Sequence, residues 1–121
     1  MASTSLNIHD IAKNISTSIT VNSTYFEKHS NFFAFRIGNL VIINCAIKIK
    51  ATLPTSGSVT VLSGLPLSSE PCMANTVNNA STIKSMFISK AANSSDAVRT
   101  WSDQGGAVGD TFQGYLIYAI S

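Results

Sequence analysis

The stretch LVIINCAIKIK (residues 40–50) constrains the fold more than any other part of the chain. Successive side chains of a β-strand point to opposite faces, so alternate residues must be considered separately. One face carries only apolar side chains, which is typical of a strand packed on a core: Val41, Ile43, Cys45, Ile47 and Ile49. The opposite face begins with Leu40 and Ile42 and ends with Lys48 and Lys50. The first half of this strand therefore needs apolar cover on both sides.

The last eleven residues, TFQGYLIYAIS (111–121), raise the same question. One face carries Phe112, Leu116, Tyr118 and Ile120, and the other carries Tyr115, Ile117 and Ala119. Soluble monomers rarely expose the apolar patch that two such strands would leave. We therefore expect the second faces to be buried between subunits of a symmetric oligomer. The interface residues predicted on this basis are Leu40, Ile42, Tyr115 and Ile117.

The remainder of the chain alternates between short strand patterns and turn residues. Strands are predicted near residues 16–21, 24–29, 31–37, 40–50, 58–62, 74–77, 83–89, 97–101 and 111–121. Gly38-Asn39 has the form of a two-residue hairpin turn between two of them. This pattern predicts an all-β fold, an antiparallel β-sandwich or jelly roll, in a single head domain over residues 16–121.

The first fifteen residues are the only part of the chain for which a helix is expected. Asn7 is a suitable N-cap, Asp10 follows near the positive end of the helix dipole, and Ile8, Ile11 and Ile15 fall on one stripe. Two interpretations remain open for this segment. It packs against copies of itself, as in the last turn of a coiled-coil stalk, or it lies across the end of the domain.

Composition excludes several classes of function. The chain has 121 residues, enough for one domain, and only 12% of them are charged. Its formal net charge is +2, and Lys48 and Lys50 form the only close basic pair, which argues against nucleic acid binding. No apolar run approaches the roughly 20 residues of a membrane span. The N-terminus lacks the basic-then-apolar order of a secretory signal.

The two cysteines are expected to be free thiols. Cys45 falls on the predicted core face, where a thiol packs as a small apolar group. Cys72 follows Pro71 in a predicted loop or strand start. The sequence alone does not exclude a disulfide between them, but an interior Cys45 favours two unpaired thiols.

Motifs for catalysis, metals or cofactors are missing from the sequence. There is no G-x-S-x-G nucleophile motif, and neither His9 nor His29 has a partner at metal-ligand spacing. The glycine cluster GGAVGD (105–110) precedes a strand and has no lysine, so it is interpreted as a loop and not as a phosphate-binding turn. We therefore expect a protein that is not an enzyme and that has no metal and no cofactor.

One stretch, RTWSDQGG (99–106), has the composition of a small-ligand site. A saccharide site needs an aromatic side chain for the C–H face of the sugar and planar polar groups for its hydroxyls. Arg99, Trp101, Asp103 and Gln104 offer both, and they form the candidate ligand-binding set. The alternative is that Trp101 packs in the core or in a subunit interface.

Three segments, taken together, resemble the C-terminal head domains of tailed-phage tail-fibre and baseplate proteins. They are NFFAFRIGNLVIINCAIKIKATLP (31–54), SVTVLSGLPLSSEP (58–71) and the terminal WSDQGGAVGDTFQGYLIYAIS (101–121). The resemblance lies in a G-N-x-V-x-I strand, an L-P-x-x-x-x-P turn and a terminal G-Y-x-x-Y strand. It covers residues 31–121, about three quarters of the chain.

The resemblance implies a homotrimeric β-sandwich at the tip of a phage tail, located on the virion and extracellular after release. Its implied partners are a host cell-wall or surface saccharide and other phage tail or baseplate proteins. The charge and the apolar run lengths given above argue separately against nucleic acid and membrane insertion. Two further interpretations are kept. One is a structural baseplate or tail-fibre module that binds no saccharide, and the other is a cellular lectin-like or C1q-like secreted domain.

Overall fold

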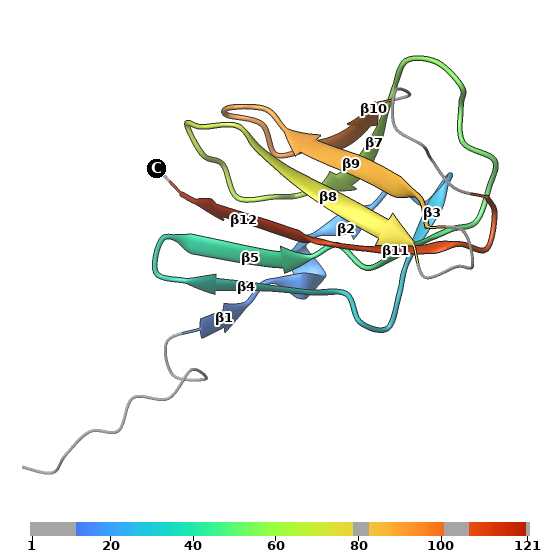
Figure 1. Ribbon diagram of the computed structural model, residues 1–121. Helices are drawn as coiled ribbons and strands as arrows, with labels where there is room; N and C mark the ends of the chain where they lie inside the picture. Colours follow the sequence, from blue (N-terminus) through green and yellow to red (C-terminus); the bar gives the residue numbers. More distant parts are fainter. Residues whose placement is uncertain (1–11, 79–82, 101–106, 121) are drawn as a thin grey trace, which may run out of the picture.

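The computed structural model describes residues 12–78, 83–100 and 107–120, and these form an all-β fold of two antiparallel sheets (Figure 1). The one helical element among them is a 3-10 turn, η1 (Ser16–Ser18). Within these residues no helix has the length and apolar character needed to cross a lipid bilayer. The predicted all-β sandwich class is confirmed at this level.

Four strands form the smaller sheet in the order β1-β4-β5-β12, and eight form the larger sheet in the order β2-β7-β10-β9-β8-β11-β6-β3. The strands of the smaller sheet are β1 (Ala12–Asn14), β4 (Phe33–Ile37), β5 (Leu40–Asn44) and β12 (Tyr115–Ala119). The strands of the larger sheet are β2 (Thr20–Val21), β3 (Phe26–Lys28), β6 (Ile47–Ile49), β7 (Ser58–Ser63), β8 (Cys72–Asn78), β9 (Ser85–Lys90), β10 (Ala97–Thr100) and β11 (Thr111–Gln113).

A long two-stranded ribbon belongs to both sheets. Its first half is the pairing of β5 with β12, and its second half is the pairing of β6 with β11. The ribbon bends where Cys45 and Ala46 separate β5 from β6 and where Gly114 separates β11 from β12. A hydrogen bond from the Cys45 N–H to the Gly114 carbonyl oxygen, 2.8 Å, holds the two strands together at the bend. The predicted strand 40–50 is therefore two strands in two sheets.

Gly114 is required at this bend because β8 passes close behind it. A Cβ on residue 114 would lie 2.5 Å from the Asn75 carbonyl oxygen and 2.9 Å from the Thr76 Cα. Both of these atoms belong to the backbone of β8 and cannot move aside without disturbing the sheet. The close approach lets one strand leave β8 and join β5 within a single residue.

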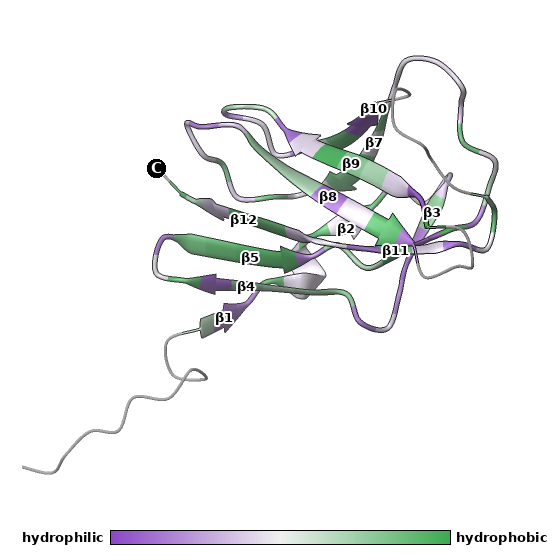
Figure 2. Ribbon diagram, viewed as in Figure 1, coloured by the Kyte–Doolittle hydropathy of each residue, from purple (hydrophilic) through white to green (hydrophobic). Residues whose placement is uncertain are grey.

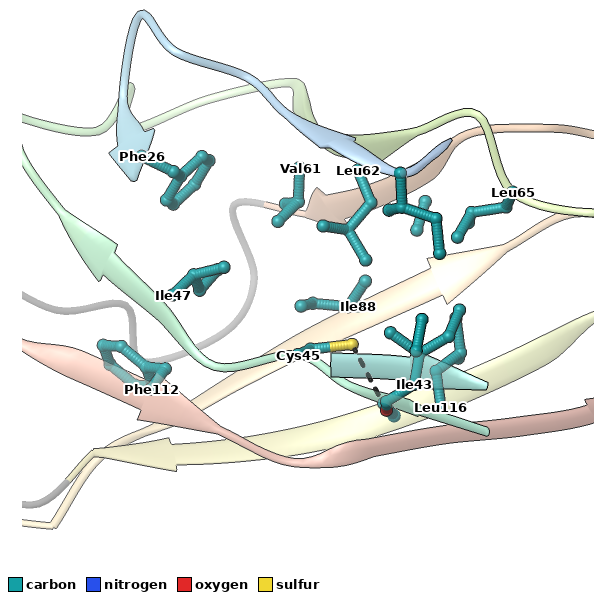
Figure 3. Packing of buried hydrophobic residues seen from close by; sticks show 14 of the residues in the cluster. Phe26, Ile43, Cys45, Ile47, Val61, Leu62, Leu65, Ile88, Phe112 and Leu116 are labelled. Atoms are coloured by element: carbon teal, nitrogen blue, oxygen red, sulfur yellow. Dashed lines mark hydrogen bonds between the residues drawn. The ribbon is translucent and has the colours of Figure 1, made fainter. Parts of the chain in front are cut away.

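The core lies between the two sheets and is built from the predicted inward face of the ribbon. Val41, Ile43, Cys45, Ile47 and Ile49 are all fully buried. Figure 3 shows Ile43, Cys45 and Ile47 facing side chains of the larger sheet, among them Val61, Leu62 and Ile88. Phe112 and Leu116, on the other strand of the ribbon, are fully buried as well. The interior is apolar where the two halves of the ribbon meet.

The larger sheet curls until its two end strands, β2 and β3, contact each other, which gives it a nearly closed, barrel-like form. These strands are consecutive in the chain and are joined by a short turn at Asn22, whose backbone oxygen accepts the N–H groups of Tyr25 and Phe26. The Asn22 side chain donates to the Thr60 carbonyl oxygen of β7, 2.9 Å away. Curling shortens the exposed edges that a flat eight-stranded sheet would present.

Two sequence predictions near the N-terminus need correction. The helix expected over residues 1–15 is wrong at Ala12–Asn14, which form β1 and pair with β4. Ladder hydrogen bonds to β4 satisfy this backbone, so no helical turn is needed there. The predicted cap Asn7 and the residues Ile8, Asp10 and Ile11 lie outside the described part of the chain. The strand expected over 16–21 is reduced to β2, because Ser16–Ser18 form the turn η1.

The other strands predicted downstream are confirmed with shifts of a few residues at their ends, whereas 40–50 and 111–121 are each divided into two strands. The hairpin turn at Gly38-Asn39 is present, with Ile37 paired directly to Leu40 and Gly38 at a φ of 58°. Both cysteines are free thiols, as expected. Cys45 is fully buried, and its thiol lies 3.9 Å from the Ile43 carbonyl oxygen.

Substituting Gly114→Ala tests the importance of the bend. We expect this change to cost about 3 kcal/mol of unfolding free energy, because the added methyl group overlaps the backbone of β8. Urea unfolding followed by circular dichroism gives the value. Gly57→Ala is the matched control: nothing lies within 4 Å of its added Cβ, and only its φ of 78° opposes the change, at about 1 kcal/mol. Equal losses in the two variants would contradict the role assigned to Gly114.

Candidate functional site

The side of the four-stranded sheet that faces away from the core is almost entirely apolar. In the strand register Phe35 lies opposite Ile42, and Ile42 lies opposite Ile117. We call this surface the outer face, and it consists of Phe33, Phe35 and Ile37 on β4, Leu40 and Ile42 on β5, and Tyr115, Ile117 and Ala119 on β12. Figure 1 shows these three strands side by side, and Figure 2 shows the strong hydrophobicity of β5.

Much of this outer face is open to solvent in the single chain. Leu40 is 40% exposed, Ile117 53% and Tyr115 55%, while Ile42 is half-buried between its neighbours. The alternate residues on the same strands, such as Ile43 and Leu116, point to the core and are fully buried. The described loops therefore leave the outer face uncovered, and within the described part of the chain only one of the two apolar sides of β5 and β12 is packed.

Aromatic rings gather at one end of the outer face. The ring centroids of Phe33 and Phe35 lie 5.4 Å apart, and those of Phe33 and Tyr115 lie 6.1 Å apart in an edge-to-face arrangement. The remaining residues in register with this face are uncharged: Ala12 and Asn14 on β1 and the buried Asn44 on β5. The Asn44 amide donates to the Asn31 carbonyl oxygen at 2.9 Å. This end offers flat, uncharged contact area.

The structure brings together all four residues predicted for a subunit interface, and it adds Phe33, Phe35 and Ile37, which were not assigned to it. The sequence carried a signal for the three added residues. Once the hairpin turn is assigned to Gly38-Asn39, the strand NFFAFRI pairs with the strand that begins at Leu40. Every second residue from Phe33 must then share a face with Ile42 and Leu40. Pairing across Gly38-Asn39 fixes that register.

The predicted ligand-binding set at residues 99–104 is placed only in part. Trp101, Asp103 and Gln104 lie outside the described residues. Arg99, on β10, is 5% exposed, and its guanidinium Nη1 donates to the Pro54 carbonyl oxygen at 3.4 Å. The Arg99 side chain thus lies in the interior, next to the segment that follows β6. A saccharide site at this junction stays a prediction.

The core also encloses a fully buried lysine. Lys90 at the end of β9 has no exposed surface, and its ammonium group contacts the Ser68 Oγ at 3.1 Å and the Ala91 carbonyl oxygen at 3.4 Å. The Tyr118 ring completes its surroundings, with the Lys90 Nζ 5.0 Å from the ring centroid. All of these partners are neutral, and no carboxylate of the described residues pairs with Lys90. Three neutral partners compensate the burial of this charge.

The Lys90 cluster fastens the loop between β7 and β8. The Tyr118 hydroxyl donates to the Pro66 carbonyl oxygen at 2.7 Å, and the Ser68 hydroxyl donates to the Glu70 carbonyl oxygen at 2.8 Å. Asn93 N–H donates to the Ser68 carbonyl oxygen at 2.7 Å. Every polar group in this cluster has a partner inside the protein. The arrangement therefore holds this loop against β9 and β12.

Within the described part of the chain, no three histidine, cysteine, aspartate or glutamate side chains gather closely enough to hold a metal ion. Comparisons of the chain with protein-family models, with curated proteins and with solved structures found no match.

The stability of the fold should fall in alkaline solution because two buried acids keep their protons. Burial raises the pKa of the Cys45 thiol from 9.0 to about 12, and burial also raises the pKa of the Tyr118 hydroxyl. The unfolded chain therefore loses these protons at lower pH than the folded chain, so the unfolding free energy declines as pH rises above 9. Cys45 alone contributes a slope of about 1.4 kcal/mol per pH unit.

Thermal unfolding between pH 8 and pH 11 measures this slope. Cys45→Ala removes one of the two acids, so its stability should decline less steeply than that of the wild type, whatever its stability at neutral pH. Parallel curves for the two proteins would contradict the assignment.

Proposed function

We propose that this chain is a non-enzymatic binding module, the homotrimeric head domain of a tailed-phage tail fibre or baseplate protein that recognises a saccharide on the host surface. The observation that supports it best is the exposed, uncharged outer face formed by β4, β5 and β12. A face of this kind needs a protein partner, because large apolar patches are otherwise rare on soluble chains. Three-fold symmetry comes from the resemblance to phage head domains, and the jelly-roll topology is an expectation from the pattern of short strands and turn residues.

A second copy of the same chain is the partner that best fits the outer face. The residues in register on it are uncharged, so two copies can approach without like charges opposing each other. Flat aromatic and aliphatic side chains such as Phe35 and Ile117 are typical of the core of an interface. Burying this face in a closed oligomer leaves the loops and the larger sheet open for a receptor.

An adhesion module is supported over an enzyme by the state of the polar groups inside the fold. The buried lysine and tyrosine both have internal partners, and the only ion pair among the described residues, Lys48 with Glu27 at 3.8 Å, is exposed. A low charge content, 12%, with roughly a third of the residues serine, threonine or asparagine, suits a protein that presents hydroxyl and amide groups to a neutral surface.

Replacing Ile117 by lysine tests the oligomer. Ile117 is 53% exposed and lies opposite Ile42 at the centre of the outer face, so the substitution should leave the chain folded but place a charge in each subunit contact. We expect sedimentation velocity at micromolar concentration to show a trimer for the wild type and a monomer for Ile117→Lys. Val108→Lys is the matched control, because Val108 is 56% exposed and lies outside the sheet. A monomeric wild type would end the proposal of self-association.

Adsorption to bacteria tests the function itself. Fluorescently labelled protein should bind some candidate host strains and not others, and purified cell-wall polysaccharide of a bound strain should compete for that binding. Ile117→Lys should bind more weakly because a monomer loses the avidity of three linked sites. Absence of binding to every strain, with the trimer intact, would favour the structural baseplate or tail-fibre module over an adhesin.

A further inference from the structure

A second exposed surface lies on the larger sheet, on the side of β8 and β9 that faces solvent. Asn75 is paired directly with Phe87, Met73 with Ser89, and Val77 with Ser85. We call these six residues the platform. Met73 is 67% exposed, Val77 44% and Phe87 39%, while the alternate residues Ala74, Met86 and Ile88 are buried. Figure 1 shows β8 and β9 side by side, apart from β4 and β5.

The chemistry of the platform differs from that of the outer face. On the outer face nearly every residue is apolar, whereas on the platform each apolar side chain lies opposite an amide or a hydroxyl. No residue of the platform is charged. A fully apolar face is suited to another protein, but a face that alternates between a ring, an amide and hydroxyls is suited to a sugar. An uncharged sugar fits best, because nothing on the platform would compensate an anion or a cation.

The geometry at the centre of the platform places the two necessary groups together. Side chains paired directly across two antiparallel strands have Cβ atoms about 5 Å apart. A sugar ring lying on the Phe87 ring would therefore have its hydroxyls within reach of the Asn75 amide, which offers both a donor and an acceptor. Met73 and Val77 flank Phe87 diagonally and would extend the apolar contact under neighbouring sugar units. Strand pairing on both sides of β9 keeps this surface rigid before any ligand binds.

We propose that the platform is the surface on which this head domain binds an uncharged polysaccharide, with Phe87 stacked on a sugar ring and Asn75 hydrogen-bonded to its hydroxyls. This inference rests on the proposed adhesion function and assigns its ligand contact to β8 and β9. It also leaves the outer face free for the subunit contact, so that both surfaces operate in the same assembly.

Methionine methyl resonances provide the direct test, because the chain carries one methionine on each side of this sheet. Met73 is on the platform and Met86, one strand away, is fully buried on the core side. Protein labelled at the methionine methyl carbons is titrated with dextran, mannan and chitin oligosaccharides. We expect at least one of them to shift the Met73 resonance saturably while the Met86 resonance stays in place. Equal shifts of both resonances would indicate a general change in the fold and would overturn the proposal.

Two substitutions test the platform proposal independently of the adhesion function. Phe87→Leu keeps an apolar side chain but removes the ring, and Asn75→Ala removes the amide. Each should weaken binding to the active oligosaccharide and to host cells by at least about tenfold, while sedimentation still shows the wild-type oligomer. Leu67→Ala, at an exposed loop residue, is the control and should bind as the wild type does.

The outcomes distinguish the two proposals. If the wild type adsorbs to cells and the Phe87→Leu and Asn75→Ala variants adsorb equally well, the platform proposal is overturned and the adhesion function stands. Conversion of Phe87→Leu to monomers would make the platform a subunit contact and would also overturn it. If an oligosaccharide shifts the Met73 resonance saturably but the protein binds no host strain, the platform is supported as a saccharide surface and the adhesion function is contradicted.

Discussion

The bend of the two-stranded ribbon at Cys45, Ala46 and Gly114 is the constraint on which the rest of the structure depends. At this point both strands cross between the two sheets, held by the hydrogen bond between Cys45 and Gly114. Because Gly114 has no side chain, the ribbon can cross directly over the backbone of β8. The core is then enclosed between the smaller sheet and the curled larger sheet, which the ribbon joins.

The bend also determines which side chains are left outside. Within the smaller sheet, β5 and β12 pack on the core with one side only, and nothing in the described chain covers the other side. The larger sheet curls on itself and presents the solvent side of β8 and β9. The described part of the chain therefore exposes two faces with different chemistry. We propose that the apolar face binds copies of the same chain and that the face alternating apolar and polar groups binds a sugar.

One cluster of buried polar groups is organised around the loop between β7 and β8. Lys90, Tyr118 and Ser68 are all withdrawn from solvent, and each has a partner that belongs to the loop between β7 and β8 or lies next to it. The loop is thereby attached to the last strand by side chains instead of by ladder hydrogen bonds. Sequence reasoning had no access to this cluster, because its members are far apart in the chain and a lysine at the end of a strand is usually solvated.

Local patterns in the sequence determined most of the strands, the hairpin at Gly38-Asn39 and the inward face of residues 41–49. These follow from alternation and turn chemistry, which act over a few residues. Only the tertiary structure decided that residues 40–50 divide between two sheets, that Ala12–Asn14 join β4, that Arg99 points inward and that Asn75 lies opposite Phe87. Each of these depends on which strands meet. Such pairing is set by contacts between segments distant in the chain, which no local pattern records.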